Sequence, residues 1–292
     1  MTLINDKLKK LDSEIILNAK KIALLKYQGL DRMISSEEKQ KIILEEAKGG
    51  GVKIKTSIPA LDGLFDGFRL GTVNVISGPT GEGKTTFLQT LTHNFWQEGV
   101  KCAWFPFEGI DSEFFEKFPE LPTFYLPKEI PDGGNSMAWI KDRIIESQVK
   151  YETQVVFIDH LHYLQDMQSV SGKDQLSLYI GDLMRKLKKF AMEAGVVVFL
   201  IVHVKSDAGV VNSRHIYYTK DDIRDSSFVK QEADSVMMIY RARKKTDLKA
   251  SGWEYTTEAV LNVDKNRRTG KVDFIDLIFQ NGRFFELERR LG

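Results

Sequence analysis

The sequence predicts an α/β fold: a mostly parallel sheet flanked by helices, with antiparallel strands at its C-terminal end and a small helical segment at its N-terminus. Between residues 72 and 202, short β-branched or aromatic runs alternate with amphipathic stretches long enough for crossover helices. After residue 235 the helical pattern gives way to consecutive strand-like runs, whereas the first 48 residues carry only a helical pattern.

Length and composition narrow the class of protein. A chain of 292 residues can bury one substantial core and accommodate a doubly wound sheet. Its 42 basic and 41 acidic residues nearly cancel, so any contact with nucleic acid must come from local clusters. The single cysteine, Cys102, excludes an internal disulfide and a zinc site of several thiolates. Since no apolar stretch reaches about 18 residues, we expect a cytoplasmic protein with no membrane contact.

The N-terminal region is predicted to form two helices. Apolar residues recur from Ile4 to Leu25 at spacings of mostly three, four or seven, which is typical of an amphipathic helix. A second helix begins at a capping box, Ser35 to Glu38, and stops at the glycine run 49–51. We therefore divide the chain into a helical segment, residues 1–48, and an α/β domain, residues 49–292.

The α/β domain is predicted to contain the following elements. Parallel strands are expected at Thr72–Ser77, Lys101–Phe107, Gln154–Asp159 and Val196–Val202, with helices at Thr85–Glu98, Ser136–Lys150 and Gln175–Ala194. Later strands are expected at Val236–Tyr240, Ala259–Val263, Asp273–Phe279 and Arg283–Leu287. Asn281–Gly282 should form the hairpin turn between the last two strands.

The segment 78–85 matches the pattern G-x-x-x-x-G-K-[ST], follows an apolar strand and leads into a helix. Its glycines let backbone amides point inward around a phosphate, and the helix N-terminus adds a favourable dipole. Lys84 is expected to contact the β and γ oxygens, and Thr85 to ligate magnesium. A glycine-rich turn before a helix is the alternative. The predicted nucleotide-binding residues are Gly78, Pro79, Thr80, Gly81, Glu82, Gly83, Lys84, Thr85 and Thr86.

Three further polar residues end or follow the predicted parallel strands, at the edge where open α/β sheets place their ligands. Asp159 is expected to hold magnesium through a bound water, with a turn or helix cap as the alternative. Glu108 is the candidate general base for the attacking water, although a solvated acid would look the same. His203 could bond the γ-phosphate and report hydrolysis to the following loop, or be a structural histidine.

The motifs outside the phosphate loop carry a resemblance. They are Asp222 to Ser227 (DIRDSS), Gln231 to Met238 (QEADSVMM) and Lys265 to Gly270 (KNRRTG). With the residues above, they resemble the hexameric replicative helicases that have a RecA-like core, the DnaB and Twinkle group. The resemblance runs from about Ile58 to the C-terminus. It implies a RecA-like P-loop ATPase that uses ATP and Mg²⁺, forms a hexameric ring, moves along single-stranded DNA and unwinds duplex in replication, with a loader or primase as a further partner.

The resemblance also assigns roles to residues far from the phosphate loop. In these helicases ATP lies between two subunits, and a lysine and an arginine from the neighbour complete the site; Lys265 and Arg267 fit that K-x-R element. An arginine supplied in trans can neutralise charge on the γ-phosphate. A basic hairpin tip exposed to water is the alternative, and Arg268 lies next in the chain. Residues 1–48 would be the linker and oligomerisation segment, unless the helix packs on its own core.

Ring helicases contact a single strand from central loops, so we expect DNA contacts in the loops Met167 to Asp174 and Lys205 to Lys220. The candidate residues are Lys173, Lys205, Arg214 and Lys220. Scattered surface lysines that are merely solvated are the alternative.

Two other functions remain open at this point. KaiC-like or recombinase-related regulatory ATPases share the core and the entry Ile58 to Gly63, and they differ in lacking DNA-stimulated hydrolysis. The second is a scaffold that binds ATP only to oligomerise and hydrolyses it too slowly to matter. A single-turnover hydrolysis assay distinguishes it from a motor.

Overall fold

The computed structural model describes residues 2–29, 32–47, 52–108, 112–118, 120–130, 136–161, 173–205, 210–211, 216–223, 226–245 and 253–287. It separates into two compact units, Met1–Gly51 and Val52–Gly292. Across the described residues, no helix combines the length and the apolar character needed to cross a membrane.

The first unit contains two helices, α1 (Thr2–Leu25) and α2 (Ser36–Ala47), as the apolar spacing and the capping box predicted. The cap forms because the Ser35 hydroxyl oxygen accepts a hydrogen bond from the Glu38 backbone amide at 3.1 Å. Apolar side chains of α1, among them Ile15, Ile22 and Leu25, are exposed.

The second unit alternates helices and strands. Its helices are α3 (Pro59–Phe65), α4 (Lys84–Gln97), α5 (Ser112–Glu116), α6 (Met137–Tyr151), α7 (Lys173–Ala194), the short 3₁₀ helix η2 (Lys220–Asp222) and α8 (Ser226–Glu232). Its strands are β1 (Lys53–Ile54), β2 (Phe68–Arg69), β3 (Thr72–Gly78), β4 (Cys102–Pro106), β5 (Val155–Asp159), β6 (Val197–His203), β7 (Val210–Val211), β8 (Ile216–Tyr217), β9 (Ser235–Lys245), β10 (Trp253–Asn266), β11 (Asp273–Gln280) and β12 (Arg283–Glu286).

The main sheet has eight strands in the order β12-β11-β10-β9-β3-β6-β5-β4. Strands β9, β3, β6, β5 and β4 are parallel to their neighbours in this series, whereas β10, β11 and β12 join antiparallel. The predicted mostly parallel sheet with antiparallel C-terminal strands is therefore confirmed. The predicted Asn281–Gly282 turn joins β11 to β12, and both residues have positive φ, 50° and 77°, as a type I′ hairpin requires.

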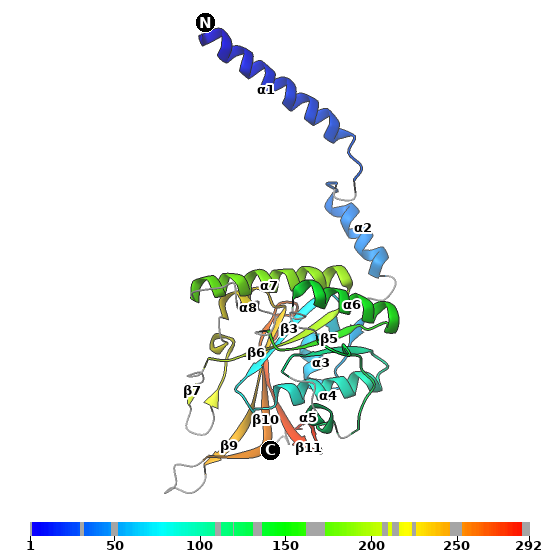
Figure 1. The fold of residues 1–292 in the computed structure, drawn as a ribbon, viewed down its shortest axis with the longest axis vertical. Helices are drawn as coiled ribbons and strands as arrows, with labels where there is room; N and C mark the ends of the chain where they lie inside the picture. Colours follow the sequence, from blue (N-terminus) through cyan, green and yellow to red (C-terminus); the bar gives the residue numbers. More distant parts are fainter. Residues whose placement is uncertain are drawn as a thin grey trace. The chain divides into compact units, whose positions relative to one another are not determined.

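Helices cover both faces of the parallel part of the sheet (Figure 1). The core residues of β5 alternate: Val155 and Phe157 pack toward α4, while Val156 and Ile158 pack toward α6 and α7. Phe157 lies between Trp104 and Phe199, with ring centroids 4.7 and 5.4 Å away. Because both faces are buried, these strands are continuous apolar runs in the sequence.

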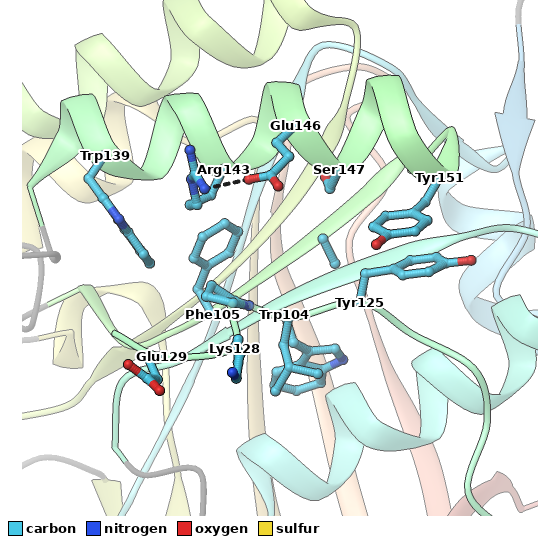
Figure 2. A pocket seen from close by; sticks show the side chains of 13 residues that line it. Trp104, Phe105, Tyr125, Lys128, Glu129, Trp139, Arg143, Glu146, Ser147 and Tyr151 are labelled. Carbon is cyan, nitrogen blue, oxygen red and sulfur yellow. Dashed lines mark ion pairs between the residues drawn. The ribbon is translucent and has the colours of Figure 1, made fainter. Parts of the chain in front are cut away.

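Strand β4 forms one edge of the sheet, and a segment following α5 partly covers it. The Tyr125 backbone amide donates to the Cys102 carbonyl at 2.9 Å, and the Tyr125 carbonyl accepts from Trp104 at 2.7 Å. A pocket of about 510 Å³ opens here between β4 and α6 (Figure 2). Its walls include the stacked rings of Tyr125 and Tyr151, 4.0 Å apart, and it contains no residue predicted for the phosphate site.

Candidate active site

The carboxyl ends of four parallel strands meet at one edge of the sheet. Gly78 at the end of β3 pairs in register with His203 at the end of β6, and Pro106 at the end of β4 pairs with Asp159 at the end of β5. Glu108 follows β4 by two residues. The structure thus brings together the phosphate loop, which was predicted from its motif, with Glu108, Asp159 and His203, which were predicted from their places at strand ends.

The phosphate loop, Gly78 to Thr85, depends on backbone angles that favour glycine. Gly78, Gly81 and Gly83 have φ values of 149°, 78° and 99°. Gly83 is the N-cap of α4, and no side chain caps this helix within the described residues. The first-turn amides of α4 therefore face the loop with their dipole available to an anion such as a phosphate.

Gly78 also lies against the backbone of β9, which gives a first prediction. In Gly78→Ala the new Cβ would lie 2.1 Å from the Ile239 carbonyl oxygen. We expect the free energy of unfolding to fall by about 2–5 kcal/mol because the strand pair must separate. Urea denaturation measures the loss. The control Gly63→Ala, in helix α3 with open space around the new Cβ, should raise stability by up to about 1 kcal/mol, and equal effects of the two changes would contradict the prediction.

Lys84 begins α4 and turns its side chain back over the loop. Its Nζ donates to the carbonyl oxygens of Gly78 and Pro79, both at 2.9 Å. Burial lowers the pKa of Lys84, while the charges of Asp159, Glu108 and Glu82 act in the opposite direction. The ammonium is thus held at the mouth of the loop, among acidic groups, where phosphate oxygens would be its natural partners.

Glu82 has a structural role that its place in the motif did not indicate. Its side chain is buried, and its Oε2 accepts a hydrogen bond from the Arg241 backbone amide of β9 at 2.7 Å. The side chain therefore anchors the loop to the sheet.

Thr85 and Asp159 meet at the base of the loop. The Thr85 hydroxyl donates to Asp159 Oδ2 at 2.7 Å, and Asp159 is only 4% exposed. Burial raises the pKa of Asp159 to about 6, helped by the nearby Glu108, against the opposing effects of Thr85 and Lys84. A hydroxyl and a carboxylate are hard oxygen donors of the kind that Mg²⁺ prefers, so these two residues fit a magnesium ion.

Glu108 lies between two histidines. Its Oε1 is 3.0 Å from His160 Nε2 and 3.3 Å from His203 Nε2, and the two imidazole rings meet edge to face with centroids 4.1 Å apart. Burial and the neighbouring His203 lower the pKa of His160 to about 4. His160 was missed in the sequence analysis. It directly follows Asp159 at a strand end, so the rule that selected the other residues could have found it.

Comparison with known proteins identifies the family to which this site belongs. The model of the DnaB-like helicase C-terminal domain family matches residues 128–286, more than half of the chain. The chain belongs to this family.

Individual relatives of the DnaB-like chain are distant. Replicative DNA helicase DnaB of Helicobacter pylori strain J99 is 22% identical over the aligned region, which covers 85% of this chain and 54% of the relative. That of Mycoplasma pneumoniae is 23% identical over an aligned region that covers 76% of this chain and 54% of the relative. The DnaB-like chain thus spans about half the length of the curated relatives it matches.

Solved structures support the fold of the DnaB-like domain. An ATPase domain solved on its own superposes with a TM-score of 0.69 at 19% identity, covering 87% of this chain and 99% of that chain. A DnaB-like replicative helicase, solved in a study of its interactions with primase, gives 0.66 at 18% identity, covering 97% and 77%. The RecA-like core predicted from the sequence is confirmed at the level of the fold.

The K-x-R element of the DnaB-like domain, Lys265 to Arg267, lies beside the start of β3, whereas the phosphate loop follows the end of that strand. Asn266 pairs with Ser235 of β9, and Ser235 pairs with Asn74 of β3, four residues before Gly78. At about 3.3 Å per residue along the strand and about 4.8 Å between neighbouring strands, the backbone of the element is about 16 Å from Gly78 of its own chain. The structure therefore does not bring Lys265 and Arg267 to the site formed by the other predicted residues.

Both cations of the K-x-R element bind the end of α8. Lys265 Nζ donates to the carbonyls of Lys230, Gln231 and Ala233, the last at 2.7 Å, and Arg267 donates to the Gln231 carbonyl. Burial lowers the pKa of Lys265.

Arg268 is distinguished from its neighbour by its contacts. Its guanidinium donates to the Phe65 carbonyl at 2.9 Å and to Asp66 Oδ2 at 2.8 Å, at the C-terminus of α3. The adjacent arginines thus have different partners: Arg267 binds the end of α8, and Arg268 binds the end of α3.

The predicted DNA-binding residues of the DnaB-like domain are only partly described. Arg214, the side chain of Lys173 and most of the loop from Met167 to Asp174 lie outside the described residues. Lys205 is exposed and donates to the Asp221 carbonyl at 3.1 Å. Lys220 forms an ion pair with Asp264 at 3.1 Å, which compensates part of its charge.

Proposed function

We propose that the chain is the motor of a ring-forming replicative helicase, which hydrolyses ATP at subunit interfaces, moves along single-stranded DNA and unwinds duplex. The observation that carries the proposal is the meeting of the phosphate loop, the Thr85–Asp159 pair and Glu108 at one sheet edge, with Lys265 and Arg267 at the other. One chain then holds two complementary halves of a shared site.

The nucleotide is proposed to be ATP with Mg²⁺. The phosphates would lie on the first-turn amides of α4 and against Lys84. A pocket of about 480 Å³, lined by Thr86, Glu116, Lys117, Phe279, Asn281 and Gly282, lies beside the loop and offers space for the base and ribose. Thr85 and Asp159 would hold magnesium, which when bound supplies positive charge to the β- and γ-phosphate oxygens.

Hydrolysis needs a base for the attacking water, and Glu108 is our candidate. His160 and His203 hold its Oε1 in one place from two sides, so that the other carboxylate oxygen can accept a proton from water. We also propose that His203, at the end of β6, contacts the γ-phosphate and transmits its loss to residues 205–220.

Ring formation is proposed from two features. Arg267 lies too far from its own phosphate loop to serve it, so a neighbouring loop is the site that it can complete. The exposed apolar side chains of α1 suit packing on another subunit, with residues 1–48 as linker and residues 49–292 as ATPase domain. The resemblance to the ring helicases leads us to propose a hexameric ring with a loader or primase as partner, and a solved DnaB-like helicase interacts with primase.

This function is tested by separating the full chain by size and measuring the rate of ATP hydrolysis of each species with and without single-stranded DNA. We expect DNA to stimulate hydrolysis only in the large species. Lys84→Ala should lower kcat about 10²–10³-fold by removing a donor to the phosphates, whereas Lys101→Ala, an exposed lysine paired with Glu152, should not. Stimulation of a monomer would count against a ring motor. Unstimulated hydrolysis by the large species would instead favour a regulatory ATPase.

A further inference from the structure

We propose that Glu108, His160 and His203, here called the Glu–His cluster, form a binding site for a divalent transition-metal ion of the zinc class. One ligand atom from each of the three residues lies within 4.8 Å of the other two. Two imidazole nitrogens and one carboxylate oxygen are a donor set that binds zinc with a fourth position left for water.

Two of the three separations between the donor atoms match those around such an ion. Ligands about 2.0–2.1 Å from a tetrahedral zinc lie about 3.3 Å from one another. Glu108 Oε1 is already 3.0 Å from His160 Nε2 and 3.3 Å from His203 Nε2. The third separation, between the two imidazole nitrogens, is no more than 4.8 Å, so side-chain rotations can complete the site.

Neighbouring strand ends of the sheet position the cluster. His160 follows β5, His203 ends β6, and Glu108 follows β4. The side chains of His160 and His203 are 10% and 26% exposed, whereas that of Glu108 is 48% exposed. The site thus has a fixed inner side of two imidazoles and an open side at Glu108, through which an ion and its water can enter.

The cluster is chemically distinct from the proposed magnesium position beside it. Thr85 and Asp159 offer only oxygen atoms and bond each other at 2.7 Å, whereas the cluster offers two nitrogens. Imidazole ligands favour zinc, copper or nickel over magnesium, which keeps an octahedral shell of oxygens. Two ions of different classes can therefore be sorted between the two positions by ligand type alone.

Occupancy of the cluster would block turnover, and this consequence rests on the proposed function. Bound to Glu108 Oε1, the ion would neutralise the carboxylate and so make its other oxygen, which we assign to the attacking water, a poor base. It would also take the His203 nitrogen that we assign to the γ-phosphate. Metal binding and hydrolysis are then mutually exclusive, so zinc acts as an inhibitor of the site.

Binding is tested without nucleotide, on the full chain, by titration with Co²⁺. Tetrahedral Co²⁺ absorbs strongly in the visible range, whereas octahedral Co²⁺ at an all-oxygen site absorbs weakly. We expect one strongly absorbing ion per chain, displaced by Zn²⁺.

His160→Asn and Glu108→Gln should each lower Zn²⁺ affinity at least about tenfold in calorimetry, while Thr85→Ala should leave the absorption unchanged. Unaltered affinity in both cluster variants, or loss of absorption in Thr85→Ala, overturns the site; thermal melting without metal verifies that each variant is folded.

Hydrolysis forms a separate arm of the test. With MgATP, Zn²⁺ should inhibit the wild-type chain and a chelator should restore it, whereas His160→Asn should retain its own rate when Zn²⁺ is added. Equal inhibition of both proteins overturns inhibition through the cluster. A chain that binds Co²⁺ as expected but hydrolyses no ATP would refute the proposed function and leave the metal site standing.

Discussion

Arg267→Ala is expected to lower kcat for ATP hydrolysis about 10³–10⁵-fold in assembled rings. The lost guanidinium would neutralise charge on the γ-phosphate of the neighbouring subunit, an interaction made mainly in the transition state, so KM should change little. Steady-state hydrolysis by the size-separated large species measures the effect. Arg267 also donates to the Gln231 carbonyl, so the assembled state of the variant must be verified by the same separation.

Arg268→Ala is the matched control. Its guanidinium holds the Phe65 carbonyl and Asp66 at the end of α3, so its removal should lower the free energy of unfolding by about 1–3 kcal/mol and leave kcat nearly unchanged. If Arg267→Ala hydrolyses ATP normally as a ring, the shared site is wrong.

Mixing two inactive variants tests whether Glu108 and Arg267 act together from different subunits. When Arg267→Ala subunits assemble with Glu108→Gln subunits, some interfaces combine an intact Glu108 from one subunit with an intact Arg267 from the other. We expect partial recovery of hydrolysis in these mixed rings. A site that uses both residues from one chain would show none.

Glu108→Gln is expected to lower kcat about 10²–10⁴-fold, because glutamine keeps the shape of the side chain but accepts no proton from water. Nucleotide affinity should be nearly unchanged, since Lys84 and the α4 amides remain. Single-turnover hydrolysis with a parallel binding titration separates the two quantities.

The matched control for Glu108→Gln is Glu113→Gln, an exposed acid on α5. It should hydrolyse ATP at the wild-type rate. Should the two variants hydrolyse ATP equally fast, another group must accept the proton.

Much of the fold was predictable because its signals are local. Strands buried on both faces, such as β5 and β6, leave uninterrupted apolar runs, and the caps of α2 and α6 lie within four residues of the helix start. The site followed from one topological rule, since Asp159 and His203 each end such a strand and Glu108 lies just after one.

The elements that could not be predicted depend on contacts far apart in the chain. Strands β1 and β2 are two residues long and exist because Lys53 pairs with Arg69 and Ile54 with Phe68. Such short segments carry no measurable periodicity.

Side-chain partners were equally hidden. The contact of His160 with Glu108 joins the ends of separate strands, and the different partners of Arg267 and Arg268 depend on α8 and α3. Sequence spacing places such residues near an edge of the sheet but does not say which groups they meet.

Strand β9 contacts both the phosphate loop and the K-x-R element. Near one end it contacts the phosphate loop, through the Arg241 amide bound to Glu82 and the pairing of Met238 with Ser77. At the other end Ser235 pairs with Asn266, next to Arg267. The strand thus connects the phosphate loop of one subunit with the arginine that, in the proposed ring, would complete the site of its neighbour. We therefore expect a tilt of one phosphate loop to displace the arginine at the next interface. The sites around the proposed ring would then hydrolyse ATP one after another.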